Sequence, residues 1–320
     1  MSSSARIRSE SLPDTTTASF KFNGHPITIT SAHEAKTVDV NGILRDPTDF
    51  HGSTQVHDVV EFGAAFAGLI GEYQDPEGFF EDSDELPDKG VVILADHFEE
   101  AADLVQSVDK LAQQVIAEPR LYDDRGFCQQ YLDLARAGYG LLRDRLPHFE
   151  EPIRGIPVSL ERAGLVITRL AQEVDLNEII PDEIRVVTKR AHPKSDSPED
   201  LMVSVKWRNL EDISRLGGKV VEVADFVNPA SWASTAAMLV SAHSRGGIPS
   251  TVVHRSFMAT EQGIVFSRRA LEGEKMGNIR PVYYTVGTSK NLTPQYYLYD
   301  PAVADAGHVL RHFLPDWYEH

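Results

Sequence analysis

Short β-branched runs alternate with helical patterns along the second half of this sequence, and this alternation constrains the fold more than any other feature. The strand patterns lie at 155–159, 183–188, 220–225, 250–254 and 280–286, and the helical patterns lie at 163–174, from the loop after Asp225 to about residue 244, and from Glu261 onward. Strands that alternate with helices predict a parallel sheet wrapped by helices on both faces. A further strand pattern, 202–205, is expected to pair antiparallel with 183–188 as a hairpin or flap. The expected fold class is therefore α/β.

One strand and helix of this series, 220–240, carries an acid between them. Asp225 closes the β-branched run, and a loop of small residues leads from it into an apolar helix. Ligands of open α/β sheets bind outside the carboxyl ends of strands, and the free backbone N–H groups at a helix start bind anions. The segment therefore predicts a phosphate site, with an ordinary turn between strand and helix as the alternative.

The first half of the chain gives a weaker pattern. Residues 1–18 are rich in Ser, Thr and Pro and are expected to be a disordered leader, with structure beginning at Ser19. Asn23-Gly24 between two short β patterns predicts a hairpin. Further elements are expected as a glycine-containing helix at 56–73, a strand at 90–96, and helices at 98–117 and 127–146 that end before Pro119 and Pro147. We therefore divide the chain into the leader, an N-terminal α+β region at 19–118 of unknown role, and a core domain at 119–320.

Charge and cysteine content narrow the function. The 320 residues include 31 Lys and Arg against 48 Asp and Glu, a net charge of −17. Such a chain is not expected to bind nucleic acid or an anionic membrane through bulk charge, so any phosphate site must be local. The single cysteine, Cys128, cannot form an internal disulfide, and no apolar run approaches membrane length. These features predict a cytoplasmic protein with Cys128 as a buried apolar residue.

Five short motifs in the core domain follow one another in a recognisable order. They are 160–165 (Leu-Glu-Arg-Ala-Gly-Leu), 188–190 (Thr-Lys-Arg), Asp225, 258–264 (Met-Ala-Thr-Glu-Gln-Gly-Ile) and 301–307 (Pro-Ala-Val-Ala-Asp-Ala-Gly). In this order they resemble the motifs of the uracil phosphoribosyltransferases, members of the type I phosphoribosyltransferase fold. The resemblance covers roughly residues 120–317. It implies transfer of a ribosyl phosphate from phosphoribosyl pyrophosphate (PRPP) to uracil or a related small heterocycle, with Mg²⁺ accompanying PRPP, in a homodimer.

The resemblance also implies roles for individual residues. The predicted catalytic residues are Arg162, Arg190 and Asp225, of which the two arginines neutralise pyrophosphate together with Lys189, while Asp225 holds the ribose hydroxyls. The 5′-phosphate is expected at the helix start, where hydroxyls are available from Ser231, Ser234 and Thr235. The base is expected against main-chain groups of Ala304, Asp305 and Ala306, with Asp305 facing pyrophosphate or its metal and Tyr297 covering the ribose or base.

The sequence also departs from the family pattern. Residues 226–233 contain no glycine where the family has two, and Trp232 lies in this segment. Glycine lets the backbone approach a phosphate closely, which a tryptophan cannot do. Three hypotheses therefore stay open: a divergent phosphoribosyltransferase, an enzyme of the same fold that uses another ligand, and a binding or regulatory protein without catalysis. The position of Trp232, in the cleft or in the core, is expected to discriminate among them.

Overall fold

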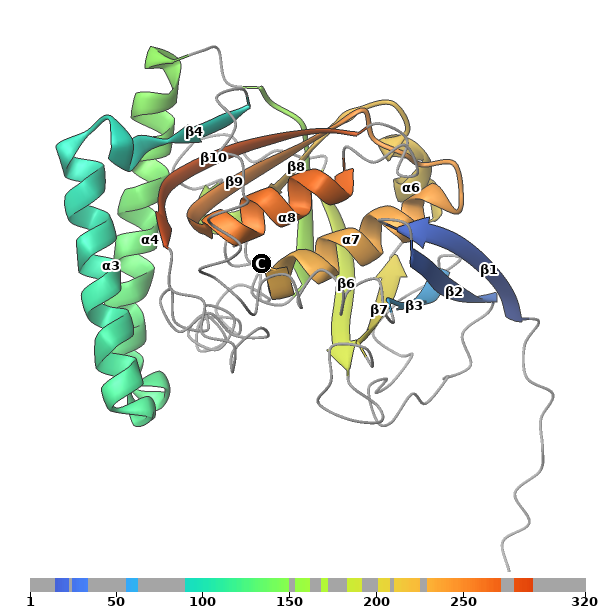
Figure 1. The fold of residues 1–320 in the computed structure, drawn as a ribbon, viewed down its shortest axis with the longest axis horizontal. Helices are drawn as coiled ribbons and strands as arrows, with labels where there is room; N and C mark the ends of the chain where they lie inside the picture. Colours follow the sequence, from blue (N-terminus) through green and yellow to red (C-terminus); the bar gives the residue numbers. More distant parts are fainter. Residues whose placement is uncertain are drawn as a thin grey trace, which may run out of the picture.

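The protein folds around one ten-stranded sheet. The computed structural model describes residues 15–22, 25–33, 56–62, 90–149, 153–161, 168–171, 183–191, 201–207, 210–224, 229–271 and 279–289. Within them the strands pair in the order β1-β2-β3-β7-β6-β5-β8-β9-β10-β4 (Figure 1).

The sheet has a parallel and an antiparallel half. The parallel strands are β6 (Ile184–Ala191), β5 (Ile156–Glu161), β8 (Val220–Ala224), β9 (Thr251–Thr260), β10 (Arg280–Ser289) and the short β4 (Val91–Ile93). The antiparallel strands are β7 (Met202–Trp207), β3 (Val56–Glu61), β2 (His25–His33) and β1 (Thr15–Phe22). The α/β class and the antiparallel pairing of β6 with β7 were both predicted and are confirmed.

Helices cover both faces of this sheet. On one face lie α6 (Leu210–Leu216), α7 (Pro229–His243) and α8 (Glu261–Leu271), and on the other lie α3 (Glu99–Ala117) and α4 (Arg125–Arg145) (Figure 1). Consecutive residues of β9 show the alternation, because Val252 joins the apolar core under α7 while Val253 joins the core under α3 and α4. Each face of a strand contributes to one layer, as the period of two requires.

The boundaries of α3 and α4 follow from local chemistry. Glu118 and Pro119 end α3, and a short 3-10 helix, η3 (Pro119–Asp123), leads to α4. The Asp124 side chain then accepts the N–H of Phe127 at 2.8 Å and caps the new helix. At the other end α4 passes into η4 (Leu146–His148), which contains Pro147. The two helices predicted at 98–117 and 127–146 are confirmed within two residues at each end.

Two expectations for the first half of the chain are wrong. Strand β1 begins at Thr15, so the last four residues of the expected disordered leader are structured. Residues 56–61 are strand β3 rather than the start of a helix. Three valines favour an extended backbone here, and β3 is paired on both sides, with β2 and β7. The glycines that suggested a helix lie outside the described residues.

The N-terminal elements lie at both edges of the sheet. Strands β1 to β3 extend it from β7, and β4 pairs with β10 at the opposite edge (Figure 1). The Asn23-Gly24 hairpin is confirmed by the register, which pairs Phe22 with His25. A further 3-10 helix, η2 (Leu94–Asp96), leads from β4 to α3. Residues before 119 therefore complete the sheet to which the core strands belong.

Candidate functional site

The central strands β5 and β8 form a topological switch point. They are neighbours in the sheet, but the chain runs from β5 to β6 on one side and from β8 through α7 to β9 on the other. The two connections also lie on opposite faces, because Leu170 in the first belongs to the core under α4, whereas α7 packs on the other face. In open α/β sheets, ligands bind at such a point, outside the carboxyl ends of the strands.

The sheet edge is recessed at this point. Strand β5 ends at Glu161, which pairs with Val187, while β6 continues for four residues to Ala191. Strand β8 ends at Ala224, which pairs with Arg255, while β9 continues for five residues to Thr260. At the rise of a β-strand the two flanking strands extend about 13 and 17 Å beyond the central pair. The chain segments that follow β5 and β8 therefore start between two longer strands.

Two predicted site residues lie on a strand that borders this recess, and two others follow the central strands in sequence. Arg162 directly follows β5 and Asp225 directly follows β8, and both lie outside the described residues. Lys189 and Arg190 belong to the part of β6 that extends past β5, where their backbones pair with Ser204 and Val203 of β7. Of these four residues, the structure therefore describes the backbone of Lys189 and Arg190 alone.

The residues predicted to bind the phosphate lie in two different turns of the helix after β8. Helix α7 starts at Pro229, a residue suited to the first helical position, and Ser231 lies in its first turn. Ser234 is half-buried and Thr235 is buried, and both lie in the second turn. Because only the first turn of a helix has free N–H groups, an anion at the start of α7 would bind residues before Ser234.

Trp232 lies in the protein core. Its side chain is 1% exposed and belongs to the apolar cluster between α7 and the sheet. Of the two positions considered for Trp232, the structure therefore shows the one in the core.

The motif at 258–264 forms the junction of β9 and α8. The hydroxyl of Thr260, the last residue of β9, accepts the N–H of Gly263 at 2.9 Å and caps the helix. This confirms the helix predicted from Glu261. The remaining predicted site residues, Tyr297, Ala304, Asp305 and Ala306, lie outside the described part of the chain.

Charged side chains near the switch point were missed by sequence reasoning. Arg255 of β9 pairs with Glu222 of β8 at 3.1 Å, and the two side chains are only 3% and 13% exposed. Next to β5, the carboxylate of Glu183 pairs with Arg169 at 3.2 Å and with Arg185 at 3.3 Å. The signal for Glu222, Arg255 and Arg185 was a charged residue inside a β-branched run, a pattern that an ordinary buried strand lacks.

A group of buried aromatic and polar side chains lies on the α8 side of β9 and β10. The rings of His254 and Tyr283 stack at 5.0 Å with an angle of 6°, and the Tyr283 hydroxyl lies 2.6 Å from Ser267 of α8. Burial lowers the pKa of His254 to about 3, so its ring is neutral near pH 7. The predicted burial of Cys128 is confirmed, and Tyr283 and Tyr284 are buried as well.

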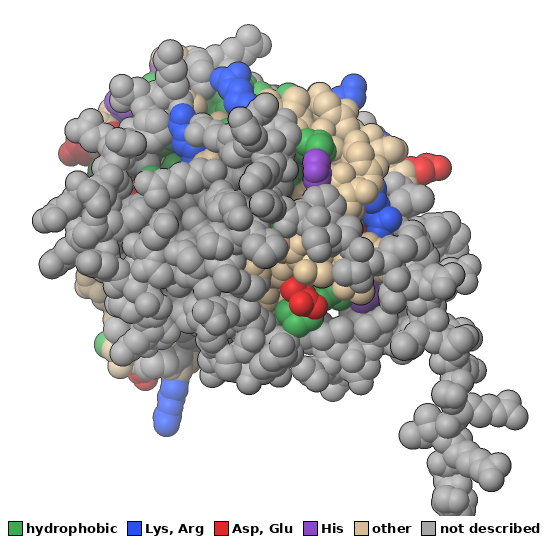
Figure 2. Space-filling model, turned by 45° about the vertical axis from the view of Figure 1, so that its right-hand side comes forward, with side chains coloured by type: hydrophobic (Ala, Val, Ile, Leu, Met, Phe, Trp, Pro, Cys, Tyr) green, Lys and Arg blue, Asp and Glu red, His purple; other side chains and the backbone are tan. Residues whose placement is uncertain are grey.

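Positive charge does not gather on the surface seen in Figure 2, where the described Lys and Arg side chains are scattered singly. Among the described residues, no helix combines the length and apolar character needed to cross a membrane. The same residues contain no group of three or more His, Cys, Asp or Glu side chains that could hold a metal ion. The predicted Mg²⁺ contact, Asp305, lies outside them.

Comparison with known proteins adds no family assignment. The sequence matches no protein-family model and no curated protein.

Proposed function

We propose that this protein is a divergent phosphoribosyltransferase that transfers a ribosyl phosphate from PRPP to uracil or a related small heterocycle. One observation carries the proposal. The two residues to which the sequence motifs assign pyrophosphate and ribose contacts, Arg162 and Asp225, directly follow the two strands of the switch point. A motif assignment and a topological rule thus select the same edge of the sheet.

The arrangement of β6 and β7 supports the proposal. The two strands form an antiparallel hairpin next to β5, and residues 192–200 connect them from the end of β6 that extends past β5. A flap in this place is what the resemblance implies. Trp232 adds support of another kind, since its side chain lies in the core between α7 and the sheet, a position that is compatible with phosphate binding after β8.

The chemistry of ribosyl transfer suits residues in these places. The reaction passes through an oxocarbenium-like state while pyrophosphate leaves, so catalysis consists largely of positioning and charge stabilisation. In the proposal Arg162, Lys189 and Arg190 stabilise the leaving pyrophosphate, Asp225 holds the ribose hydroxyls, and the start of α7 binds the 5′-phosphate. In the proposal Mg²⁺ accompanies PRPP, and Asp305 faces the pyrophosphate or this metal.

Other parts of the proposal follow from the resemblance alone. The base would bind main-chain groups of Ala304, Asp305 and Ala306 under Tyr297. We also propose a homodimer in the cytoplasm. The absence of glycine in 226–233 keeps the two alternatives, another ligand or no catalysis, as outcomes of the experiment.

The test is isothermal titration with PRPP and Mg²⁺, followed by an assay for product with uracil and a panel of other bases. We expect binding and turnover in the native protein, and loss of both in Arg162→Ala and Asp225→Ala. The exposed pair Arg143 and Asp144 provides matched controls, Arg143→Ala and Asp144→Ala, which should behave as the native protein. Absence of heat at millimolar PRPP, with a folded sample, rejects the proposal. Binding without product favours the non-catalytic alternative.

A further inference from the structure

Two arginines share one carboxylate beside β5. The Oε2 atom of Glu183 lies 3.2 Å from Nη2 of Arg169 and 3.3 Å from Nε of Arg185. The other carboxylate oxygen, Oε1, accepts a hydrogen bond from the hydroxyl of Ser159. Neither arginine therefore has a carboxylate to itself. The three charged residues, which we call the arginine group, carry one more positive than negative charge.

The excess positive charge of the arginine group is unfavourable by itself. The two guanidinium nitrogens lie within 3.3 Å of the same oxygen atom, so the two cations are neighbours, and like charges repel at such separations. An arginine does not relieve this repulsion by losing its proton, because the guanidinium stays charged in proteins. A single arginine is enough to neutralise Glu183. The second arginine has a reason to lie here if the group binds an anion.

Arg185 has donors to offer to such an anion. Within the described part of the chain it makes one hydrogen bond, from Nε to Glu183, and its terminal amino groups have no partner there. The side chains of Arg169 and Arg185 are 23% and 26% exposed, whereas that of Glu183 is 7% exposed. A solvent ion therefore meets the guanidiniums before it meets the carboxylate. Guanidinium N–H groups bind the oxygens of phosphate groups in pairs.

The arginine group lies beside the strand on which the predicted pyrophosphate motif begins. In the register Arg185 pairs with Ser159, and the motif 160–165 starts at the next residue. Val186 belongs to the core under α7, so the preceding side chain, Arg185, lies on the opposite face of the sheet. Because the whole chain has a net charge of −17, a local excess of positive charge is needed to attract an anion to this place.

We infer that Arg169 and Arg185 form an oxyanion site, which binds phosphate or pyrophosphate on the α4 side of β5. The inference goes beyond the proposed function, because neither arginine was assigned a contact with PRPP. It applies to a free anion as well as to the pyrophosphate group of PRPP. Glu183, the most buried member of the group, holds the two guanidiniums next to each other.

The test is isothermal titration of the native protein with inorganic pyrophosphate, and separately with inorganic phosphate, at low ionic strength. We expect saturable binding of pyrophosphate, and a loss of affinity of about tenfold or more in both Arg169→Gln and Arg185→Gln. Arg185→Lys keeps the charge but not the paired donors and should retain part of the affinity. Glu183→Gln removes the competing negative charge at nearly constant shape, so pyrophosphate should bind about fivefold more tightly. A group with a structural role only would not show this gain.

The matched control is Arg215→Gln in α6, where Arg215 lies 3.2 Å from Asp212 and is 37% exposed. It changes the net charge by the same amount and should leave pyrophosphate binding unchanged. Absence of saturable binding in the native protein overturns the inference, and so does unchanged affinity in both Arg169→Gln and Arg185→Gln. Urea denaturation shows whether each variant is folded. If Arg185→Gln does not fold, Arg169→Gln and Glu183→Gln decide the question.

Titration with PRPP distinguishes the two sources of the anion. If Arg169→Gln and Arg185→Gln also bind PRPP more weakly, the arginine group binds the pyrophosphate of PRPP. If only inorganic pyrophosphate binds more weakly, the group is a separate site for a free anion. If the native protein binds pyrophosphate through the two arginines but does not bind PRPP, the proposed function fails while the oxyanion site stands.

Discussion

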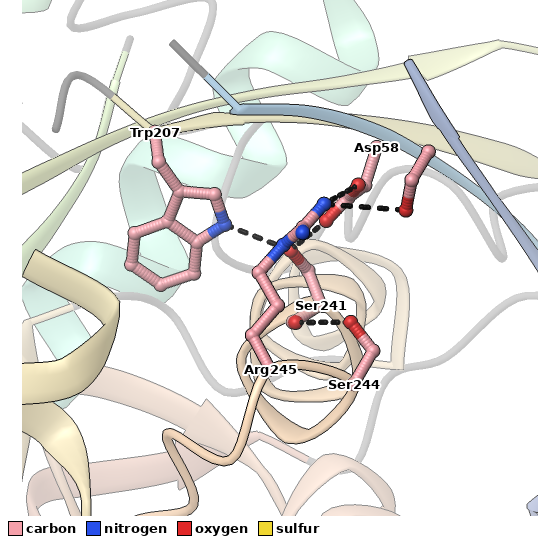
Figure 3. A network of polar contacts seen from close by, with 6 residues as sticks. Asp58, Trp207, Ser241, Ser244 and Arg245 are labelled. Carbon is pink, nitrogen blue, oxygen red and sulfur yellow. Dashed lines mark hydrogen bonds and ion pairs between the residues drawn. The ribbon is translucent and has the colours of Figure 1, made fainter. Parts of the chain in front are cut away.

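Arg245, which follows α7, donates a hydrogen bond of 2.6 Å to Asp58 of β3, 187 residues earlier in the chain. Figure 3 shows the network around this ion pair: the Ser241 hydroxyl of α7 binds the other carboxylate oxygen of Asp58 and accepts the indole N–H of Trp207 at 2.8 Å. Asp58 is fully buried. A strand of the N-terminal region is thus joined to the helix that starts at the candidate site.

Replacement of Asp58 by alanine should strongly destabilise the protein. The change leaves the guanidinium of Arg245, which is only 16% exposed, without its carboxylate partner. Breaking a buried pair in this way costs about 3–5 kcal/mol of unfolding free energy. Urea denaturation measures the loss. Asp133→Ala, which breaks an exposed pair on α4, is the control and should cost at most about 1 kcal/mol. Equal losses in the two variants would show that the network of Figure 3 does not stabilise the fold.

Replacement of Trp232 by alanine should empty part of the core between α7 and the sheet. The side chain is 1% exposed, and truncation of a buried aromatic residue costs about 3–5 kcal/mol. Trp232→Phe keeps most of the volume and should cost clearly less. Thermal and urea denaturation of both variants check this. A Trp232→Ala protein with native stability but altered PRPP affinity would instead place the indole in the ligand site.

Much of the fold could be predicted from local patterns. The strands from β5 to β10 and the helices α7 and α8 were recognised because β-branched runs suit buried strands and apolar residues at helical spacing suit helices, whereas α6 was not predicted. The error at 56–61 has the same origin: the valines of β3 satisfy both patterns over a short run, and only pairing with β2 and β7 decides between them. Tertiary context overrides local preference in such segments.

The candidate site was predictable only in part. The end of each apolar run in the sequence indicated that Arg162 and Asp225 follow strands. The sequence did not indicate that β5 and β8 are neighbours, because strand order depends on contacts between segments far apart in the chain. Arg255 was overlooked for a related reason. A charged residue in a strand becomes interpretable once its partner, Glu222, is known to lie on the adjacent strand.

Replacement of Gly138 by alanine should destabilise the packing of α4 on the sheet. A Cβ atom at this position would clash with the ring of Phe257 in β9 and lie 3.2 Å from Val286 in β10. Overpacking of a core costs about 1–3 kcal/mol, although alanine favours the helix itself. The double variant Gly138→Ala/Phe257→Leu removes the clashing ring and should recover part of the loss relative to Phe257→Leu alone. An unchanged unfolding free energy in Gly138→Ala would contradict the close approach.

Two buried histidines should make the protein less stable in acid. Burial, followed by repulsion from Lys206 and opposed by Asp58, lowers the pKa of His57 to about 4, and burial lowers the pKa of His254 to about 3. In the unfolded chain both rings titrate near 6.5. Below that pH the unfolded state therefore binds protons that the folded state does not, and stability falls as pH decreases toward 4 for His57 and toward 3 for His254.

The slope of this pH dependence identifies the histidine responsible. Each ring that stays neutral in the folded protein lowers the unfolding free energy by about 1.4 kcal/mol for every pH unit below 6.5. Urea denaturation at about pH 7.5, 6.5, 5.5 and 4.5 should give the unfolding free energy at each pH, and from these values the slope. His254→Phe keeps an aromatic ring against Tyr283 but cannot be protonated, so its slope between pH 5.5 and 4.5 should be smaller than that of the native protein by about 1.4 kcal/mol per unit. His148→Gln, a change of an exposed side chain, is the control and should keep the native slope. Identical slopes in the native and His254→Phe proteins would mean that His254 takes up its proton in the folded state, against its complete burial in the β9–β10 layer.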